Sequence, residues 1–159
     1  MQYAMIRLPT RRQVGLLFAN AAAMHAQSER TGTTIHQEID FNVPPARIYG
    51  ILLDAKQFSA FTKDTAELES RAGGAFRLFG GRIEGRNVEL VTNQRIVQAW
   101  RPAAWPAGVY SIVRFELSAQ GSGTRIVFDH VGFPPDNWEH LNAGWPRNYW
   151  DPLQTFLAG

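Results

Sequence analysis

Apolar and polar side chains alternate along residues 33–43 (TTIHQEIDFNV). One side of this pattern holds Ile35, Gln37, Ile39 and Phe41, and the other holds His36, Glu38, Asp40 and Asn42. Strict alternation is typical of a strand with one face in the core and the other in solvent. The segment is therefore predicted to be a half-buried strand.

A helical pattern follows directly in residues 44–62 (PPARIYGILLDAKQFSAFT). Pro45 suits a first helical turn, where the backbone N–H has no intrahelical partner. Apolar residues then recur at helical spacing, at Ile48, Ile51, Leu52 and Phe58. We predict one helix, or a pair of short helices, after the first strand.

The middle of the chain carries only strand patterns, separated by turns rich in Gly or Asn. They fall in residues 66–71, 74–81, 81–93, 94–102, 108–120 and 123–133. The Gly pairs and triplets between them, such as Gly80-Gly81, suit ordinary turns. None of them opens a helix after a strand with the lysine that a phosphate-binding loop needs, so we expect no nucleotide cofactor.

The final segment, from residue 134 onward, has the period of an amphipathic helix. Asp136 and Glu139 have the spacing of a capping box at its start. A stripe about 120° wide collects the large apolar side chains on one face. The members of this stripe are Trp138, Leu141, Trp145, Tyr149, Pro152, Leu153 and Phe156. We predict that this closing helix packs against the sheet.

Two prolines lie inside the predicted closing helix, Pro146 and Pro152. An interior proline costs about 3 kcal/mol, whereas each large apolar side chain that becomes buried contributes about 1.5–3 kcal/mol. Packing outweighs this cost, so the helix is expected to persist with kinks near each proline. Such kinks free backbone carbonyls, including those of Asn142 and Asn148.

The N-terminal residues 1–26 have the order of a secretory signal, with a basic start and an apolar run from Val14 to Ala26. Arg11 and Arg12 stand directly before this run, as in twin-arginine export signals. We predict a signal segment in residues 1–26, a linker in 27–32 and one domain in 33–159. The expected location is the periplasm or another exported site, and a cytoplasmic protein is the alternative.

Composition limits the function further. The chain has 159 residues, no cysteine, and 16 Lys and Arg against 14 Asp and Glu. Arg7, Arg11 and Arg12 belong to the predicted signal, which leaves 13 basic residues against 14 acidic ones in the rest. This balance lacks the basic patch of a nucleic-acid-binding protein, and the apolar run near the N-terminus is too short for a membrane span.

Four segments resemble one known family, in order along the chain: residues 41–62, 73–101, 114–134 and 144–157. The sequence is similar to the activator of heat-shock protein 90 ATPase homologue-like branch of the START-like (SRPBCC) superfamily. The resemblance implies an α+β helix-grip fold, with a curved antiparallel sheet of six to seven strands wrapped around a long, kinked C-terminal helix. It also implies a cavity between sheet and helix. A chaperone partner is not expected for an exported chain.

Strand alternation and the helical stripe indicate which side chains face such a cavity. The candidate ligand-binding residues are Phe76, Gln98, Trp100, Ser111, Phe115, Phe128, His130, Trp145, Asn148 and Tyr149. A mostly apolar site with a few polar groups suits a hydrophobic or amphipathic small molecule. The alternative is that these side chains simply fill the core.

Catalysis is a rival hypothesis, in which His130 acts with Tyr149 in a cyclase or hydrolase reaction. A co-chaperone-like interaction domain in the cytoplasm is the third. The histidines and carboxylates have no metal-ligand spacing, and Glu38, Asp40, Glu116 and Asp129 fall on the outer strand face. We therefore predict no metal site and name no catalytic residue.

Overall fold

The computed structural model describes residues 32–159. The predicted signal segment 1–26 and all but the last residue of the linker 27–32 lie outside this range. The strands are β1 (Thr34–Phe41), β2 (Glu67–Leu68), β3 (Ala75–Leu78), β4 (Ile83–Val91), β5 (Arg95–Pro102), β6 (Ser111–Gln120) and β7 (Gly123–Val131). The helical elements are α2 (Pro45–Leu53), α3 (Ala55–Thr62), a 3₁₀ turn (Pro135–Asn137), α4 (Trp138–Trp145), a π-helical turn (Pro146–Trp150) and α5 (Asp151–Ala158).

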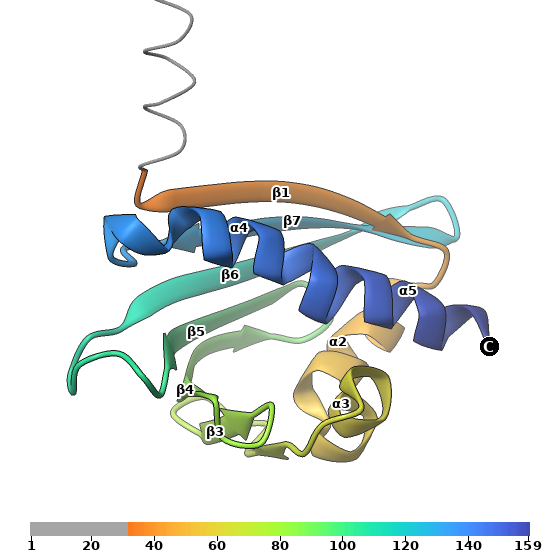
Figure 1. Cartoon of the computed structure of the whole chain (residues 1–159). Helices are drawn as coiled ribbons and strands as arrows, with labels where there is room; N and C mark the ends of the chain where they lie inside the picture. Colours follow the sequence, from red (N-terminus) through yellow and green to blue (C-terminus); the bar gives the residue numbers. More distant parts are fainter. Residues whose placement is uncertain (1–31) are drawn as a thin grey trace, which may run out of the picture. The chain divides into compact units, whose positions relative to one another are not determined.

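The seven strands form one antiparallel sheet in the order β1-β7-β6-β5-β4-β3-β2. The sheet curves, and the helix that runs from α4 to α5 crosses its concave face, as Figure 1 shows. Helices α2 and α3 follow β1 and lie near the α5 end of this helix. The predicted α+β helix-grip fold, with its helix pair after the first strand, is confirmed.

Strand parity places the buried side chains as predicted. On β1, Ile35 and Phe41 are buried, whereas His36, Glu38 and Asp40 are exposed. The register continues this face across the sheet, since Ile35 lies opposite His130 and Phe115 lies opposite Phe128. The core therefore sits between the concave face and the helices.

Gly85 allows a close approach at the centre of the sheet. A Cβ atom at this position would lie 2.0 Å from the Ala99 carbonyl oxygen and 2.5 Å from Cζ of Phe76. Real side chains never come so close, so only glycine fits here. Gly85 pairs with Trp100 across the β4–β5 ladder, and this packing therefore holds the Trp100 strand in place.

Helices α2 and α3 cover one end of the core. Ile48, Ile51 and Leu52 are buried on α2, as the helical spacing predicted, and Phe58 and Phe61 are buried on α3. Asp54 separates the two helices, and its carboxylate accepts a hydrogen bond from the Gln57 backbone N–H at 2.8 Å. This cap satisfies one of the unpaired donors at the start of α3.

The start of the closing helix differs from the prediction. No side-chain cap forms at the N-terminus of α4, because a 3₁₀ turn over Pro135–Asn137 precedes it and places Asp136 within that turn. The expected capping box of Asp136 and Glu139 is therefore wrong. Asn137 instead accepts a hydrogen bond from the Trp105 indole N–H at 3.2 Å.

The first proline is accommodated by a π-helical turn. In this turn, Pro146–Trp150, the backbone N–H of Asp151 donates to the Pro146 carbonyl, five residues back. A π-helix turns less per residue than an α-helix, so the adjacent Tyr149 and Trp150 are both buried. The stripe of an ideal α-helix included Tyr149 but missed Trp150. Pro152 lies near the start of α5, which continues directly from this turn, and its missing N–H leaves a backbone carbonyl of the preceding turn without a helical partner.

Gln37 on β1 satisfies groups that this turn leaves free. Pro146 has no N–H to pair with the carbonyl of Asn142, four residues earlier. The Gln37 side-chain amide donates to that carbonyl at 3.1 Å. Its amide oxygen accepts a hydrogen bond from the Trp150 indole N–H at 2.7 Å. The carbonyl expected to be freed at Asn142 is thus bound by the sheet.

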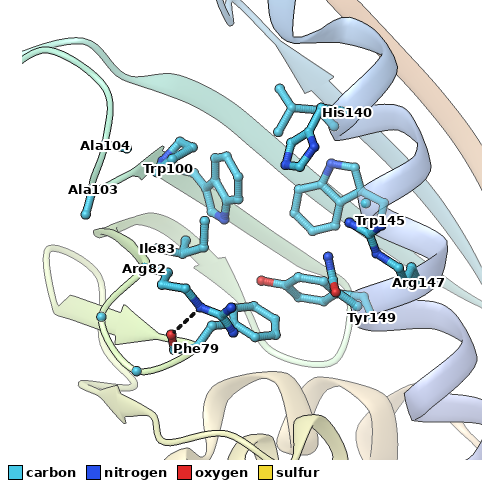
Figure 2. A pocket seen from close by; sticks show the side chains of 16 residues that line it. Phe79, Arg82, Ile83, Trp100, Ala103, Ala104, His140, Trp145, Arg147 and Tyr149 are labelled. Atoms are coloured by element: carbon cyan, nitrogen blue, oxygen red, sulfur yellow. Dashed lines mark hydrogen bonds between the residues drawn. The ribbon is translucent and has the colours of Figure 1, made fainter.

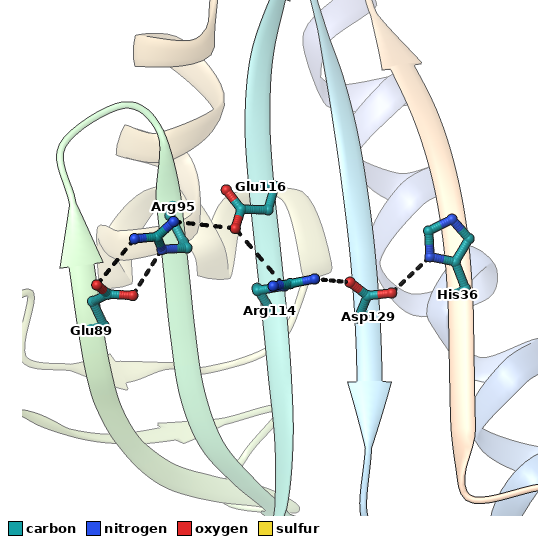
Figure 3. Close-up of polar contacts among 6 residues, drawn as sticks. All are labelled: His36, Glu89, Arg95, Arg114, Glu116 and Asp129. Atoms are coloured by element: carbon teal, nitrogen blue, oxygen red, sulfur yellow. Dashed lines mark hydrogen bonds and ion pairs between the residues drawn. The ribbon is translucent and has the colours of Figure 1, made fainter.

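The outer face of the sheet carries a row of charged side chains, drawn in Figure 3. Its members, from β4 to β1, are Glu89, Arg95, Glu116, Arg114, Asp129 and His36. The hydrogen bond from His36 to Asp129, 2.7 Å long, raises the pKa of His36 above its usual 6.5. The predicted position of the carboxylates Glu116 and Asp129 on the outer face is confirmed. No helix of residues 32–159 is long and apolar enough to cross a membrane.

Candidate functional site

A cavity of about 590 Å³ lies between the closing helix and one half of the sheet. Its sheet side is formed by the β3–β4 turn, residues 79–83, and by the end of β5 with the loop after it, at Trp100 and residues 102–104. Its helix side is formed by seven residues from His140 to Tyr149. Figure 2 shows aromatic rings of both sides facing the same space.

Four of the ten predicted ligand-binding residues line this cavity: Trp100, Trp145, Asn148 and Tyr149. The other six are buried in the core, with at most 5% of the side chain exposed, and do not line it. These six are Phe76, Gln98, Ser111, Phe115, Phe128 and His130. The aromatic ones fit the alternative in which inner-face side chains fill the core, since Phe115, Phe128 and Trp145 pack ring against ring.

His130 is completely buried, and protein atoms bind both of its ring nitrogens. Nδ1 accepts a hydrogen bond from the Trp145 indole N–H at 3.1 Å. Nε2 must then carry the ring proton, and it donates to the Ser111 hydroxyl at 2.7 Å. Ser111 in turn donates to the Trp100 carbonyl at 2.9 Å. Burial lowers the pKa of His130 to about 3, so the ring is neutral at ordinary pH.

This arrangement gives the His130–Tyr149 acid–base hypothesis no support. A general base needs a free nitrogen within reach of its substrate and a pKa near the working pH. Neither nitrogen of His130 is free, and burial raises the pKa of the Tyr149 hydroxyl, against a smaller opposing effect of Trp100. What the geometry does provide is an ordered chain of hydrogen bonds that fixes the Trp145 ring at the cavity wall.

Gln98 also has a structural partner. Its amide donates to the Asn87 side-chain oxygen at 3.0 Å, and Asn87 donates to the Glu69 carbonyl at 2.8 Å. Asn87 is fully buried beside an irregularity in the β4–β5 register. The pair therefore ties the loop before β3 to the centre of the sheet.

Trp100 differs from these satisfied residues. Its side chain is 4% exposed, yet its indole nitrogen has no hydrogen-bond partner among residues 32–159. The Tyr149 hydroxyl faces the same space (Figure 2) and is near enough to Trp100 for the indole to oppose part of the rise in its pKa, but the two groups do not meet the geometry of a hydrogen bond. Two polar groups thus lie within the aromatic wall of the cavity.

The opposite wall and the rim of the cavity contain residues that the sequence pattern did not predict. Phe79 forms part of the wall, and Arg82, His140 and Arg147 are exposed along it. For the helix residues a signal existed, because His140, Gly144 and Arg147 recur at helical spacing beside the aromatic stripe. Phe79 has a φ of 54° and precedes two glycines that also have positive φ, a conformation that side-chain periodicity does not predict.

Comparisons with known proteins agree with this fold. The family model described as "Activator of Hsp90 ATPase homolog 1-like protein" matches residues 42–158. An activator of 90 kDa heat shock protein ATPase homolog from Dictyostelium discoideum is 33% identical over 125 residues, which are 78% of this chain and 33% of that protein. The chain spans about a third of the length of the curated relatives it matches.

Solved structures give the same result. The crystal structure of an HSP90 activator from Plasmodium falciparum has a TM-score of 0.76 and 25% identity, covering 80% of this chain and 97% of that one. DynU16, described as a putative protein in the dynemicin biosynthetic locus, has a TM-score of 0.67 and 16% identity, covering 79% and 47%. At that identity the second likeness concerns the fold alone.

Proposed function

We propose that this chain, which belongs to the family of Activator of Hsp90 ATPase homolog 1-like proteins, binds a hydrophobic or amphipathic small molecule in the cavity between its sheet and its closing helix. The family and the START-like fold predicted from the sequence are confirmed. One fold of this kind serves many functions, so the function has to be argued from the site.

The size and wall of the cavity carry the proposal. Its volume of about 590 Å³ falls within the range of small-molecule sites, about 300–1,000 Å³. Phe79, Trp100, Trp145 and Tyr149 line it, and their rings supply apolar surface for a ligand.

Fluorescence titration with N-phenyl-1-naphthylamine, a neutral aromatic probe that brightens in apolar sites, tests the proposal. Gly144 lines the cavity, and a Cβ atom there would touch only Asn148, at 3.6 Å. Gly144→Leu should therefore place an apolar side chain in the cavity and weaken probe binding at least about tenfold, which is about 1.4 kcal/mol.

Gly50→Leu is the matched control, because Gly50 is also helical and a Cβ atom added there would have no neighbour within 4 Å. It should leave the probe affinity unchanged. Absence of saturable binding to the wild type, or equal binding by Gly144→Leu, would contradict the proposal. If the wild type binds the probe and Gly144→Leu does not, native mass spectrometry of protein purified from its host would supply the mass of the natural ligand.

A second candidate is a protein interaction with a chaperone, favoured by the names of the relatives from Dictyostelium discoideum and Plasmodium falciparum. Those names describe activators of the heat shock protein ATPase. The test is the ATPase rate of the host's Hsp90 with and without the added chain. A raised rate supports this candidate, and an unchanged rate across a full titration removes it.

Export is proposed as the setting, from Arg11 and Arg12 directly before the apolar run that ends at Ala26. The mass of the denatured protein, isolated from its host, tests it. A chain shortened by up to 26 residues in a periplasmic fraction supports export. A full-length chain in the cytoplasm contradicts it and favours the chaperone candidate.

A further inference from the structure

The inner wall of the cavity presents a donor that the protein leaves unpaired. The Trp100 indole N–H is buried and has no partner among residues 32–159. Buried polar groups are nearly always hydrogen-bonded in folded proteins, and an exception calls for an explanation. An indole N–H can only donate. A bound molecule that satisfies it must therefore carry an acceptor atom at its buried end.

The Tyr149 hydroxyl adds a second polar group at the same end. In Figure 2 its oxygen points from the helix toward the space below the Trp100 ring. The side chain is 4% exposed, and burial raises its pKa, so the hydroxyl keeps its proton at neutral pH. It can donate to the same ligand oxygen as Trp100, which suits a carbonyl or hydroxyl oxygen with two lone pairs.

The rim of the cavity is positively charged, which suits an acidic ligand. None of the 16 residues that line the cavity is Asp or Glu, whereas Arg82, Arg147 and His140 are among them. The guanidinium of Arg82 forms an ion pair with the Asp64 carboxylate at 2.7 Å, so it is only partly available to a ligand. Arg147 takes part in no ion pair of residues 32–159, including with Asp151 one turn further along the helix.

From these two ends we infer the polarity of the ligand: an acidic amphipathic molecule with an oxygen acceptor at Trp100 and Tyr149, an apolar body against Trp145 and Phe79, and an acid group at Arg147. The inference rests on the proposed function, since it concerns the same cavity. A guanidinium binds carboxylate and sulfonate groups through charge-assisted hydrogen bonds. A ligand with a cationic group at this rim would meet Arg147 with the same charge.

The acidic end is tested with two probes that share one ring system. 8-Anilinonaphthalene-1-sulfonate carries an acid group, and N-phenyl-1-naphthylamine is its neutral parent. Arg147→Gln should weaken binding of the sulfonate about fivefold and leave the neutral probe within about twofold, as expected for a partly exposed charge pair. Arg147→Glu should weaken the sulfonate further.

Arg71→Gln is the control for the loss of a positive charge, because Arg71 is exposed, pairs with Glu69 and does not line the cavity. It should change neither affinity. Equal effects of Arg147→Gln on both probes, or none on the sulfonate, would overturn the acidic end of the inference.

The buried end is tested with 6-propionyl-2-(dimethylamino)naphthalene, a neutral probe with a carbonyl oxygen. Trp100→Phe keeps an aromatic ring and removes the N–H, so it should weaken this probe about fivefold and leave N-phenyl-1-naphthylamine within about twofold. Tyr149→Phe removes only a hydroxyl and should act in the same direction. Trp105→Phe is the control, because the Trp105 N–H is bound by Asn137 and Trp105 does not line the cavity.

The outcomes separate the inference from the function on which it rests. If the wild type binds none of the probes, the proposed function fails. If it binds the neutral parent, but the Trp100 and Tyr149 variants weaken both neutral probes equally or neither, the function stands and the buried end of the inference is wrong. Urea unfolding of each variant identifies any loss of binding that follows from misfolding.

Discussion

Acidification should destabilise this protein through the buried imidazole of His130. Burial lowers the pKa of this ring to about 3 in the folded state, against 6.5 for an unperturbed histidine. Between these two values the unfolded chain binds a proton at this position and the folded chain does not. The stability that depends on neutral His130 is therefore complete above pH 6.5 and is lost as the pH falls below it.

The size of this effect follows from the two pKa values. One proton taken up only by the unfolded chain lowers the free energy of unfolding by up to about 1.4 kcal/mol per pH unit. Summed from about pH 7 to about pH 4.5, the loss assigned to His130 is about 2.5 kcal/mol. A loss of that size is a large share of the stability of an ordinary domain, about 5–15 kcal/mol.

Urea unfolding at a series of pH values, compared between the wild type and His130→Gln, measures this loss. Glutamine keeps a donor and an acceptor for Ser111 and Trp145 but does not titrate. Other groups that titrate in acid affect the stability of both proteins, so their effect cancels in the comparison. An example is Asp129, whose pKa is raised by partial burial but lowered overall by hydrogen bonds from His36 and Arg114. The stability advantage of the wild type over the variant should shrink by about 2.5 kcal/mol across this range.

His36→Gln provides a control of opposite sign. The pKa of His36 is raised, chiefly by its hydrogen bond to Asp129, so its contribution is present below pH 6.5 and lost as the pH rises through the folded-state value. The advantage of the wild type over His36→Gln should therefore grow on acidification. Parallel pH profiles for the wild type and His130→Gln would refute the reasoning, because they would mean that His130 protonates equally in both states.

Three substitutions test the packing that positions the cavity. Gly85→Ala should destabilise the fold by about 3 kcal/mol, because the new Cβ would lie 2.0 Å from the Ala99 carbonyl oxygen. Gln37→Ala should cost about 2 kcal/mol, because it leaves the Asn142 carbonyl and a buried indole N–H unpaired. Leu153→Ala, at a fully buried position, should cost about 2–5 kcal/mol. The free energy of unfolding in urea measures all three.

The changes at Gly85 and Gln37 each have a control. Gly50→Ala adds the same methyl group in a helix with open space around it, so it should stabilise the protein by about 0.5–1 kcal/mol. A loss as large as that of Gly85→Ala would contradict the steric argument. Pro146→Ala should reduce the cost of Gln37→Ala, since it restores an N–H for Asn142. Additive effects of these two changes would show that Gln37 does not act through that carbonyl.

Period-two alternation was sufficient to predict the sheet and its two faces. Gln98, Ser111 and His130 were placed on the inner face, and the structure puts them there, buried. Alternation predicts the face of the sheet to which a side chain points, but not the groups that the side chain contacts there. These three polar residues meet other protein groups, at Asn87, Trp100 and Trp145. Whether an inner-face residue lines a cavity or contacts other protein atoms depends on tertiary packing, and the local sequence pattern does not determine that packing.

The helix face was predicted only as far as an ideal α-helix holds. Trp145, Asn148 and Tyr149 were identified as candidates and line the cavity. Trp150 was missed because the π-helical turn departs from about 100° per residue. The wall at Phe79 was missed for another reason, since a left-handed backbone at a bulky residue is uncommon and has no periodic signature.

The π-helical turn also decides which changes in length the chain tolerates. A single π-helical turn within an α-helix holds one residue more than an α-helical turn, so removing one residue from 146–150 would let the segment close as an α-helix. Leu153, which is fully buried, would then keep nearly the same orientation, but Tyr149 and Trp150 could no longer both face inward. Removing one residue from α4 instead would rotate every later side chain by about 100° about the helix axis, so the π-helical turn is the part of the closing helix where the loss of a residue disturbs the core least.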